Sequence, residues 1–397
     1  MKKEMKRLGL LAVLALAGTS ANAWAADTAT PAPTPAAPVV TMSGLIDTYY
    51  SYNFTNSANT ANGSGNKGIY YNSTDNSFTL GLAEAGFTAT QGPASGHLTL
   101  AYGETADASA FGSTSATGLS VEQAYVSYNA DKWTFNAGKF VTWMGNEVVE
   151  SKSNMNYSRS LLFWYTIPIW HTGLSVNFAP DAAFGVTGYI TNGWNNASAA
   201  TPDLGMKTYG LQFLMKPDSA WTVALNGVLG PNPFSASDPS LHYVGEGIVT
   251  WNVSDKFTLA VDGEYGAQDA AGPTTLTTAD LSTTKTVNSA SFWGVALYGR
   301  YQMTSQCAVA LRLEELKDDT NYLGLYGSAP IASAFDVEAR EATLTLEHAF
   351  TPNTLMRLEG RYEYALSGGS IYAAKTGPFA GGSADQLTGT ASMVFSY

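Results

Sequence analysis

The stretch Gln386–Tyr397, QLTGTASMVFSY, alternates between apolar and polar side chains at every residue but one. A period of two predicts a β-strand with an apolar and a mostly polar face. The apolar face carries Leu387, Gly389, Ala391, Met393, Phe395 and Tyr397, and the other carries Gln386, Thr388, Thr390, Ser392, Val394 and Ser396. The strand reaches the final residue and ends on an aromatic. In a closed barrel the last strand pairs with the first, so this stretch favours a barrel over the alternative, the last strand of a soluble sandwich.

Composition points the same way. Charged residues make up 13% of the chain, about half the usual share. Aromatic residues make up 12%, there are 39 glycines, and a mean hydropathy of -0.06 is too polar for a helical membrane protein. Membrane barrels have this composition because their lipid-facing positions exclude charge.

The net charge is -12, and lysine and arginine do not cluster, which argues against a nucleic-acid partner. The negative excess predicts cation preference in a pore, or divalent-ion contacts near lipid headgroups. It is equally explained by the solubility of exposed loops.

The first residues have the pattern of a secretory signal. Residues 1–25 contain a basic start (Lys2–Arg7), an apolar run (Leu8–Gly18) and small residues around Ala23 that suit cleavage. The apolar run is too short for a membrane-spanning helix. Residues 26–39 are rich in Pro, Ala and Thr and predict an extended linker, which leaves 40–397 as the barrel. A single cysteine, Cys307, excludes an internal disulfide.

Alternating segments and turn residues predict an all-β, antiparallel transmembrane barrel of about 16 strands, within a range of 14–18. The predicted strands are Val40–Asn53, Ser77–Thr90, Gly96–Gly103, Ser120–Tyr128, Lys132–Thr142, Trp170–Phe178, Ala183–Asn192, Lys207–Met215, Ala220–Leu229, Leu241–Asn252, Lys256–Gly266, Ser291–Gln302, Cys307–Leu316, Arg340–Phe350, Thr354–Ala365 and Gln386–Tyr397.

The connections between these strands alternate in length. Those after even-numbered strands are short and contain turn residues, as in Gly92-Pro93-Ala94 and Thr351-Pro352-Asn353, whereas those after odd-numbered strands are long. Short periplasmic turns on one rim and long extracellular loops on the other are typical of outer-membrane barrels. Aromatic residues near strand ends predict girdles at the two lipid interfaces, although plain β-propensity is an alternative; they are Tyr49, Tyr50, Trp133, Phe178, Trp251, Phe257, Trp293 and Tyr397.

Charged residues within strands are the first candidates for function. Arg357, Glu359, Arg361 and Glu363 alternate along one strand and therefore share a face. Each would cost a few kcal/mol near the membrane midplane, about 2–4 kcal/mol for arginine, so we expect them to line the lumen. Two other strands repeat the pattern with Asp262, Glu264, Arg312 and Glu314. The eight residues predict a lumen wall that filters solutes by charge, or equally a wall that neutralises itself.

The third long connection, about 144–169, differs from the others. It contains Glu147, Glu150, Lys152 and Arg159 together with bulky aromatic residues. By analogy with sixteen-stranded general porins, whose third loop folds inward, these four residues are the predicted pore constriction. An ordinary surface loop is the alternative.

Nothing in the chain argues for an enzyme, a metal or a cofactor. Glu359 and Glu363 are about 13 Å apart along an extended strand, too far for a glycosidase pair. No nucleophile elbow or phosphate loop occurs. The four histidines, His97, His171, His242 and His348, do not have metal-ligand spacing.

Several short motifs resemble a known family. They are Gly44 to Tyr50 (Gly-x-Ile-Asp-x-Tyr-Tyr), Gly138-Lys139-Phe140, Gly145, Glu147, residues 156–163 (NYSRSLLF), Pro168 and His171-Thr172-Gly173. The chain is similar here to the bacterial outer-membrane family called putative β-barrel porin-2 (OmpL-like). The resemblance implies an outer-membrane barrel with pore activity and no known substrate.

The sequence thus predicts a porin in a bacterial outer membrane for passive diffusion of small hydrophilic solutes or ions. Its partners would be outer-membrane lipid and those solutes, with a homo-oligomer left open. One alternative is an adhesin or surface scaffold with a plugged lumen. Another is a secreted soluble β protein that binds glycans.

Overall fold

The computed structural model describes residues 37–55, 66, 69–111, 118–198, 206–231, 240–277, 284–319, 323, 337–365 and 385–397, with backbone alone for 270–277, 284–288 and 365. The predicted signal peptide, 1–25, lies outside the described residues. So does the predicted linker 26–39, apart from its last three residues.

Sixteen strands form among the described residues, close to the predicted bounds except after Gly266 and before Ser291, where two strands are longer than predicted. They are β1 (Val39–Asn53), β2 (Ser77–Gln91), β3 (Ala94–Tyr102), β4 (Ser120–Ala130), β5 (Trp133–Val141), β6 (Trp170–Phe178), β7 (Phe184–Thr191), β8 (Thr208–Met215), β9 (Trp221–Pro231), β10 (Leu241–Ser254), β11 (Phe257–Thr277), β12 (Thr284–Gln302), β13 (Cys307–Asp318), β14 (Val337–Thr351), β15 (Thr354–Ala365) and β16 (Asp385–Ser396). The short helices are α2 (Glu104–Ala108), η2 (Ser151–Ser153) and α3 (Leu161–Tyr165). Within the described ranges, no helix has the length and hydrophobicity needed to cross a membrane.

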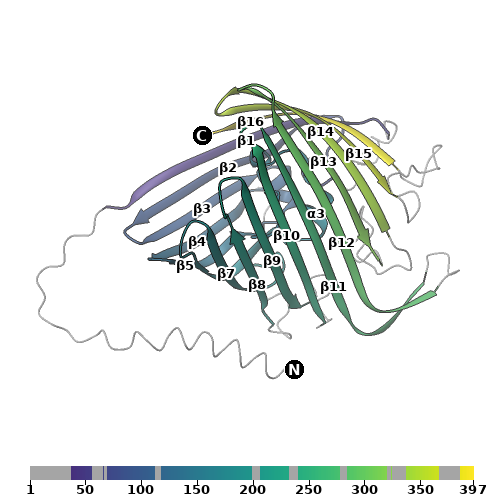
Figure 1. The fold of residues 1–397 in the computed structure, drawn as a ribbon, viewed down its shortest axis with the longest axis horizontal. Coiled ribbons are helices and arrows are strands. Elements are labelled where there is room, and N and C mark those ends of the chain that lie inside the picture. Colours follow the sequence, from purple (N-terminus) through teal and green to yellow (C-terminus); the bar gives the residue numbers. More distant parts are fainter. Residues whose placement is uncertain are drawn as a thin grey trace, which may run out of the picture.

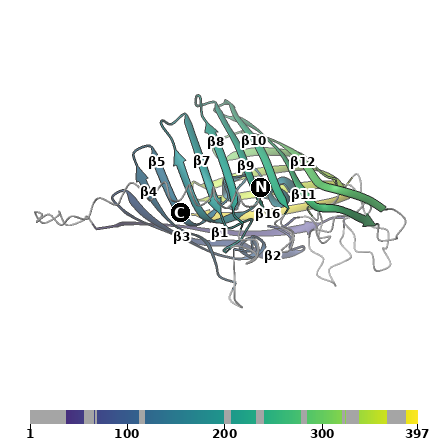
Figure 2. The ribbon, with the colours of Figure 1, turned by 90° about the horizontal axis from the view of Figure 1, so that it is seen from below.

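The strands form one closed barrel in which each strand pairs with its sequence neighbours (Figures 1 and 2). The first and last strands close the ring antiparallel, with Leu45 opposite Ser396. Two backbone hydrogen bonds between Gly44 and Tyr397, of 3.2 and 3.0 Å, extend this seam. A side chain at Gly44 would collide with the Tyr397 ring, 2.4 Å away, so the glycine makes room for the aromatic residue. The predicted barrel closure is confirmed.

Alternation along the strands separates an apolar outer face from a polar inner face. In β16, Phe395 is 45% exposed on the outside and Ser392 is 5% exposed on the inside. The inner face of this strand also carries Gln386, Thr388 and Thr390, all buried. The period-two pattern therefore predicted the orientation of the strand correctly.

Short and long connections alternate around the barrel, and the short turns all lie at one rim (Figure 1). One predicted long connection is wrong. β11 continues to Thr277 and β12 begins at Thr284, where these two residues pair. The many threonines of this stretch are β-branched and favour a strand. The Gly272-Pro273 pair, which usually indicates a turn, led to the wrong prediction.

Aromatic side chains pair on the outer face near the short-turn rim. Trp221 stacks on Trp251 with ring centroids 5.1 Å apart, and Trp133 meets Phe178 at 4.6 Å. Tyr49, however, is 2% exposed and its phenol bonds to a carboxylate inside the barrel. Its assignment to an outer girdle was therefore wrong: it follows Asp47 by two positions and shares the inner face.

Two glycines of the recognised motifs face each other across β5 and β6. Gly138 has φ +136° and pairs with Gly173. A Cβ at Gly138 would lie 2.3 Å from the Ala124 carbonyl oxygen, and one at Gly173 would lie 2.2 Å from the Ile190 carbonyl oxygen. Both glycines are needed because neighbouring backbones approach so closely.

Candidate functional site: the barrel interior

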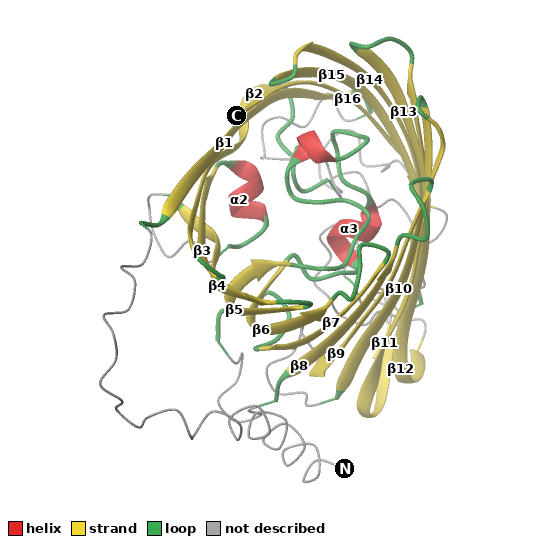
Figure 3. Cartoon of the chain, turned by 60° about the vertical axis from the view of Figure 1, so that its left-hand side comes forward, coloured by secondary structure: helices red, strands yellow, loops and turns green. Residues whose placement is uncertain are grey.

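Residues 142–169, between β5 and β6, lie inside the ring of strands (Figure 3). We call them the inner segment. Its α3 begins at the Ser160 cap, whose hydroxyl accepts a hydrogen bond of 3.0 Å from the Phe163 backbone N–H. Gly145, at φ +95°, turns the chain where a Cβ would strike Ile167 at 2.8 Å. The segment buries a set of apolar side chains, Met144, Val149, Tyr157, Leu161, Leu162, Phe163, Tyr165 and Ile167.

Charges of β15 hold the backbone of the inner segment. Arg357 donates to the carbonyls of Ser151 at 2.5 Å and Asn154 at 2.7 Å. Glu359, two residues on, accepts from the backbone N–H of Tyr157 at 2.7 Å and from that of the next residue at 3.0 Å. Both side chains are buried. The alternating charges of this strand thus satisfy donors and acceptors of a non-regular chain, which has no ladder of its own.

Arg312 of β13 is the most heavily bonded of the wall residues. It donates to Glu147 at 2.8 Å and to the Ser158 carbonyl at 2.6 Å on the inner segment, and to Glu341 of β14 at 2.9 Å. Its neighbour Glu314 accepts at 2.8 Å from the first backbone N–H of α3. The guanidinium is fully buried. Such a group is tolerated inside a protein only when it is paired and fully hydrogen-bonded.

Arg361 and Glu363 complete the β15 row. Arg361 donates at 2.5 Å to the Arg159 carbonyl and also pairs with Glu363. Arg159 itself turns back into the segment and donates to the Tyr157 carbonyl at 2.6 Å. Its guanidinium also lies 4.9 Å from the centre of the Tyr71 ring. Arg159 therefore stabilises the fold of the segment.

Further along the same wall, beyond β12, carboxylates of β10 and β11 accept bonds from the same segment. Glu246 accepts from the Gly145 backbone N–H at 2.8 Å, and Asp262 from that of Asn146 at 3.2 Å. Glu264 accepts from the hydroxyl of Thr166. All three carboxylates are buried.

A tyrosine of the segment reaches β1. The Tyr157 hydroxyl donates to Asp47 at 3.0 Å, and the Ser151 hydroxyl donates to the same carboxylate at 2.6 Å. Burial, followed by the charge of Asp47, raises the pKa of Tyr157 well above its ordinary value. The phenol therefore remains a donor at every physiological pH.

The four predicted constriction residues occupy different environments. Glu147 and Arg159 are buried and make the hydrogen bonds described above. Glu150 is half-buried and Lys152 is exposed. Toward the short turns, a cavity of about 230 Å³ is lined by residues of β1 to β4, among them His97 and Gln123. This cavity is open space between the inner face of β1 to β4 and the rest of the described interior.

Several interior groups were not among the predicted site residues. They are Asp47, Glu84, Glu122, Glu246 and Glu341. Period-two counting along β1, β10 and β14 would have found three of them, because each shares a face with other inward polar residues. The sequence does not reveal that the wall charges bond to the inner segment, because cross-strand and loop contacts depend on register.

Several solved structures of outer-membrane proteins have a similar fold. They include the outer-membrane channel DcaP of Acinetobacter baumannii (TM-score 0.57, 13% identity, covering 92% of this chain and 99% of that one). The anion-selective porin of Comamonas acidovorans (0.57, 10%, 91% and 100%) and the trimer form of OmpT of Vibrio cholerae (0.57, 11%, 91% and 100%) are similar in the same way. At these identities the likeness shows the fold alone.

No curated protein matches the chain in sequence. A family model matches residues 39–397 of the chain. The family and the fold are those of channels rather than of enzymes. The barrel is a transmembrane one, and its location is the bacterial outer membrane. The chain belongs to the family described as "Putative beta-barrel porin-2, OmpL-like".

Proposed function

We propose that the protein is a porin for passive diffusion of small hydrophilic solutes or ions, with the inner segment as its constriction. The observation that carries the proposal is the set of bonds from β1, β10, β11, β13 and β15 to this segment. A segment held from several sides inside a barrel has a fixed cross-section and can act as a size filter.

Selection by charge would come from groups at the edge of the passage. Most of the predicted lumen-wall charges are used to hold the segment, so they contribute to the local field without being free to move. Glu150 and Lys152 are the more exposed charges of the segment. Because these two charges are of opposite sign, the preference for cations that we propose comes from the net charge of -12.

The assembly and surroundings follow from the same proposal. The apolar outer face, with its aromatic pairs near the short turns, suits contact with outer-membrane lipid. OmpT of Vibrio cholerae, similar in fold, is described in a trimer form, and a homo-oligomer is the arrangement we infer for this chain.

Single-channel recording of the refolded protein in a planar bilayer under a salt gradient tests this function. The proposal expects discrete open steps and a reversal potential of the sign for cation selectivity. Silence from protein that is folded and inserted would contradict it.

A second candidate is an adhesin or surface scaffold whose lumen is plugged. The extent of the bonding to the inner segment favours it, because a segment this well held can also block. In that case the native barrel stays silent and conducts only when the segment is replaced.

A further inference from the structure

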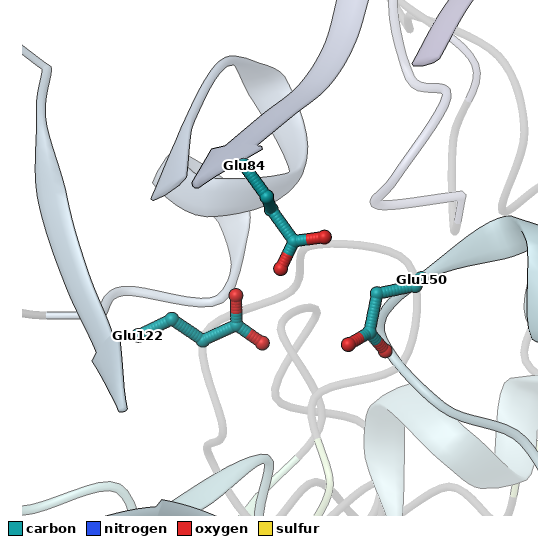
Figure 4. Close-up of side chains that lie close together, drawn as sticks. All are labelled: Glu84, Glu122 and Glu150. Atoms are coloured by element: carbon teal, nitrogen blue, oxygen red, sulfur yellow. The ribbon is translucent and has the colours of Figure 1, made fainter. Parts of the chain in front are cut away.

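Three glutamates meet inside the barrel, on the side of the inner segment away from β13 and β15. Glu84 comes from β2, Glu122 from β4 and Glu150 from the inner segment (Figure 4). One carboxylate oxygen from each lies within 4.8 Å of the others. No two of these residues are close in sequence, so the fold alone brings them together.

A β-bulge places Glu122 in this cluster. Opposite β3, Leu100 pairs with Val121 and Thr99 pairs with Gln123, which leaves Glu122 as the extra residue of β4. A bulge re-aims one side chain relative to plain alternation. Glu122 points inward as a result and is fully buried.

Glu122 also has no donor. Neither of its carboxylate oxygens accepts a hydrogen bond from any described residue. The other wall carboxylates differ, because Glu359 and Glu314 each receive backbone N–H groups. A buried ionised carboxylate without a partner is strongly unfavourable. The cluster therefore requires one of two things. Either a cation binds to it, or Glu84 and Glu122, which lie within hydrogen-bonding distance of each other, share a proton.

We propose that Glu84, Glu122 and Glu150 bind a hard divalent cation of the calcium class. Carboxylate oxygens are the ligands that Ca²⁺ prefers, at about 2.3–2.6 Å, so two of its ligands are at most about 4.6–5.2 Å apart. The three carboxylate oxygens lie within 4.8 Å of one another, which is close enough for one such ion to bind all three. Three carboxylates offer up to six oxygens, and water completes the shell from the side of the half-exposed Glu150.

Other charged groups nearby leave the site negative. Asp47 adds to the negative field at Glu84, and Lys152 opposes it. Lys139 is the cation that acts on Glu122, but its amine donates to the carbonyls of Phe111 and Val121, each at 2.5 Å. Neither lysine makes an ion pair with the cluster among the described residues.

The bound cation would tie the inner segment to β2 and β4. The segment is then held from both sides, by arginines and carboxylates on one and by the cation on the other. The site stands whether or not the barrel conducts, because it depends on ligand geometry alone. Conductance and cation binding are therefore separate readouts.

The test is calcium binding to the whole refolded protein in detergent free of lipopolysaccharide, after removal of metals with EDTA. Isothermal titration with CaCl₂ should show one saturable site, and the melting temperature should rise on calcium addition. Glu122→Gln and Glu150→Gln should each weaken the affinity at least about tenfold, since each removes a charged ligand. Both should also lose the calcium-dependent melting shift.

Two further variants decide the assignment. Glu315→Gln changes a carboxylate on the outer face of β13, paired with Arg340, and should leave calcium binding unchanged. Asp262→Asn probes the second group of close carboxylates, Glu246, Asp262 and Glu264. If binding is lost in Asp262→Asn and kept in Glu122→Gln, the ion sits in that second group and the proposal is wrong.

A shared proton gives a different result. Wild-type protein would then show no saturable calcium binding, and Glu122→Gln would raise the melting temperature equally in calcium and in EDTA. That result overturns the proposal. Glu150→Gln, on a connecting segment, covers the case in which Glu122→Gln fails to fold.

Discussion

At the scale of single residues, the interior depends on a few fully buried charges. Arg312 connects the inner segment with β13 and β14 through Glu147, Ser158 and Glu341. Burying a guanidinium is costly, and only the complete set of partners offsets the cost. The arginine is therefore a positioning residue for the segment.

Replacing Arg312 with methionine leaves Glu147 and Glu341 without their cation. We expect the free energy of unfolding in detergent to fall by about 3–5 kcal/mol. Arg340→Met is the matched control, because Arg340 pairs with Glu315 and Glu338 on the exposed face. It should change stability by no more than about 1 kcal/mol. Equal losses in the two variants would contradict this account of Arg312.

The glycine pair of β5 and β6 gives a second prediction at this scale. Gly173→Ala places a methyl group against the Ile190 carbonyl and should destabilise the barrel by about 1–3 kcal/mol. Gly188→Ala on β7 is the control, because nothing lies within 4 Å of its added Cβ. Thermal unfolding of both variants checks the difference, and a neutral Gly173→Ala would refute the close approach.

At the scale of elements, strands were predictable and contacts between them were not. Alternation fixes which face of a strand is buried, so β16 and β15 could be oriented from Gln386–Tyr397 and Thr354–Ala365 alone. The inward turn of Glu122 was not predictable, because a bulge breaks the period. The extension of β11 was missed because Gly272-Pro273 is usually a turn signal.

The candidate site was predictable in part for the same reason. Arg357 and Glu359 lie on the face that the sequence indicates, but their bonds to Ser151 and Tyr157 need the register and the loop path. Their predicted part in solute selection stays a prediction. What the geometry adds is the reason that an arginine and a glutamate alternate there: backbone carbonyls and N–H groups of the segment alternate opposite them.

Lys152 offers a test of the inner segment as an element. We expect Lys152→Cys, made together with Cys307→Ser, to react with a negatively charged thiol reagent during recording. Because Lys152 is exposed on the segment, the bulky product should lower conductance by a factor of about two or more. Lys207→Cys, just before β8, is the control and should react without changing conductance. Reaction at Lys152→Cys with no change in conductance would remove the segment from the passage.

At the scale of the whole molecule, one closed barrel combines an apolar exterior with an interior that is largely bonded together. The seam between β1 and β16 completes the ring. The inner segment lies inside this ring and forms hydrogen bonds with strands that are far apart in sequence, β1, β10 and β15. In the function we propose, the barrel supplies the passage and the inner segment sets its width.

The most direct test of this account compares the single-channel conductance of the native protein with that of a variant in which residues 146–158 are replaced by a glycine-serine linker. Heat-modifiable migration on gels confirms that both barrels are folded. The account predicts discrete steps from the native protein and larger steps from the variant. Native silence with conduction only in the variant would make the segment a plug, and equal steps would show that it does not limit the passage.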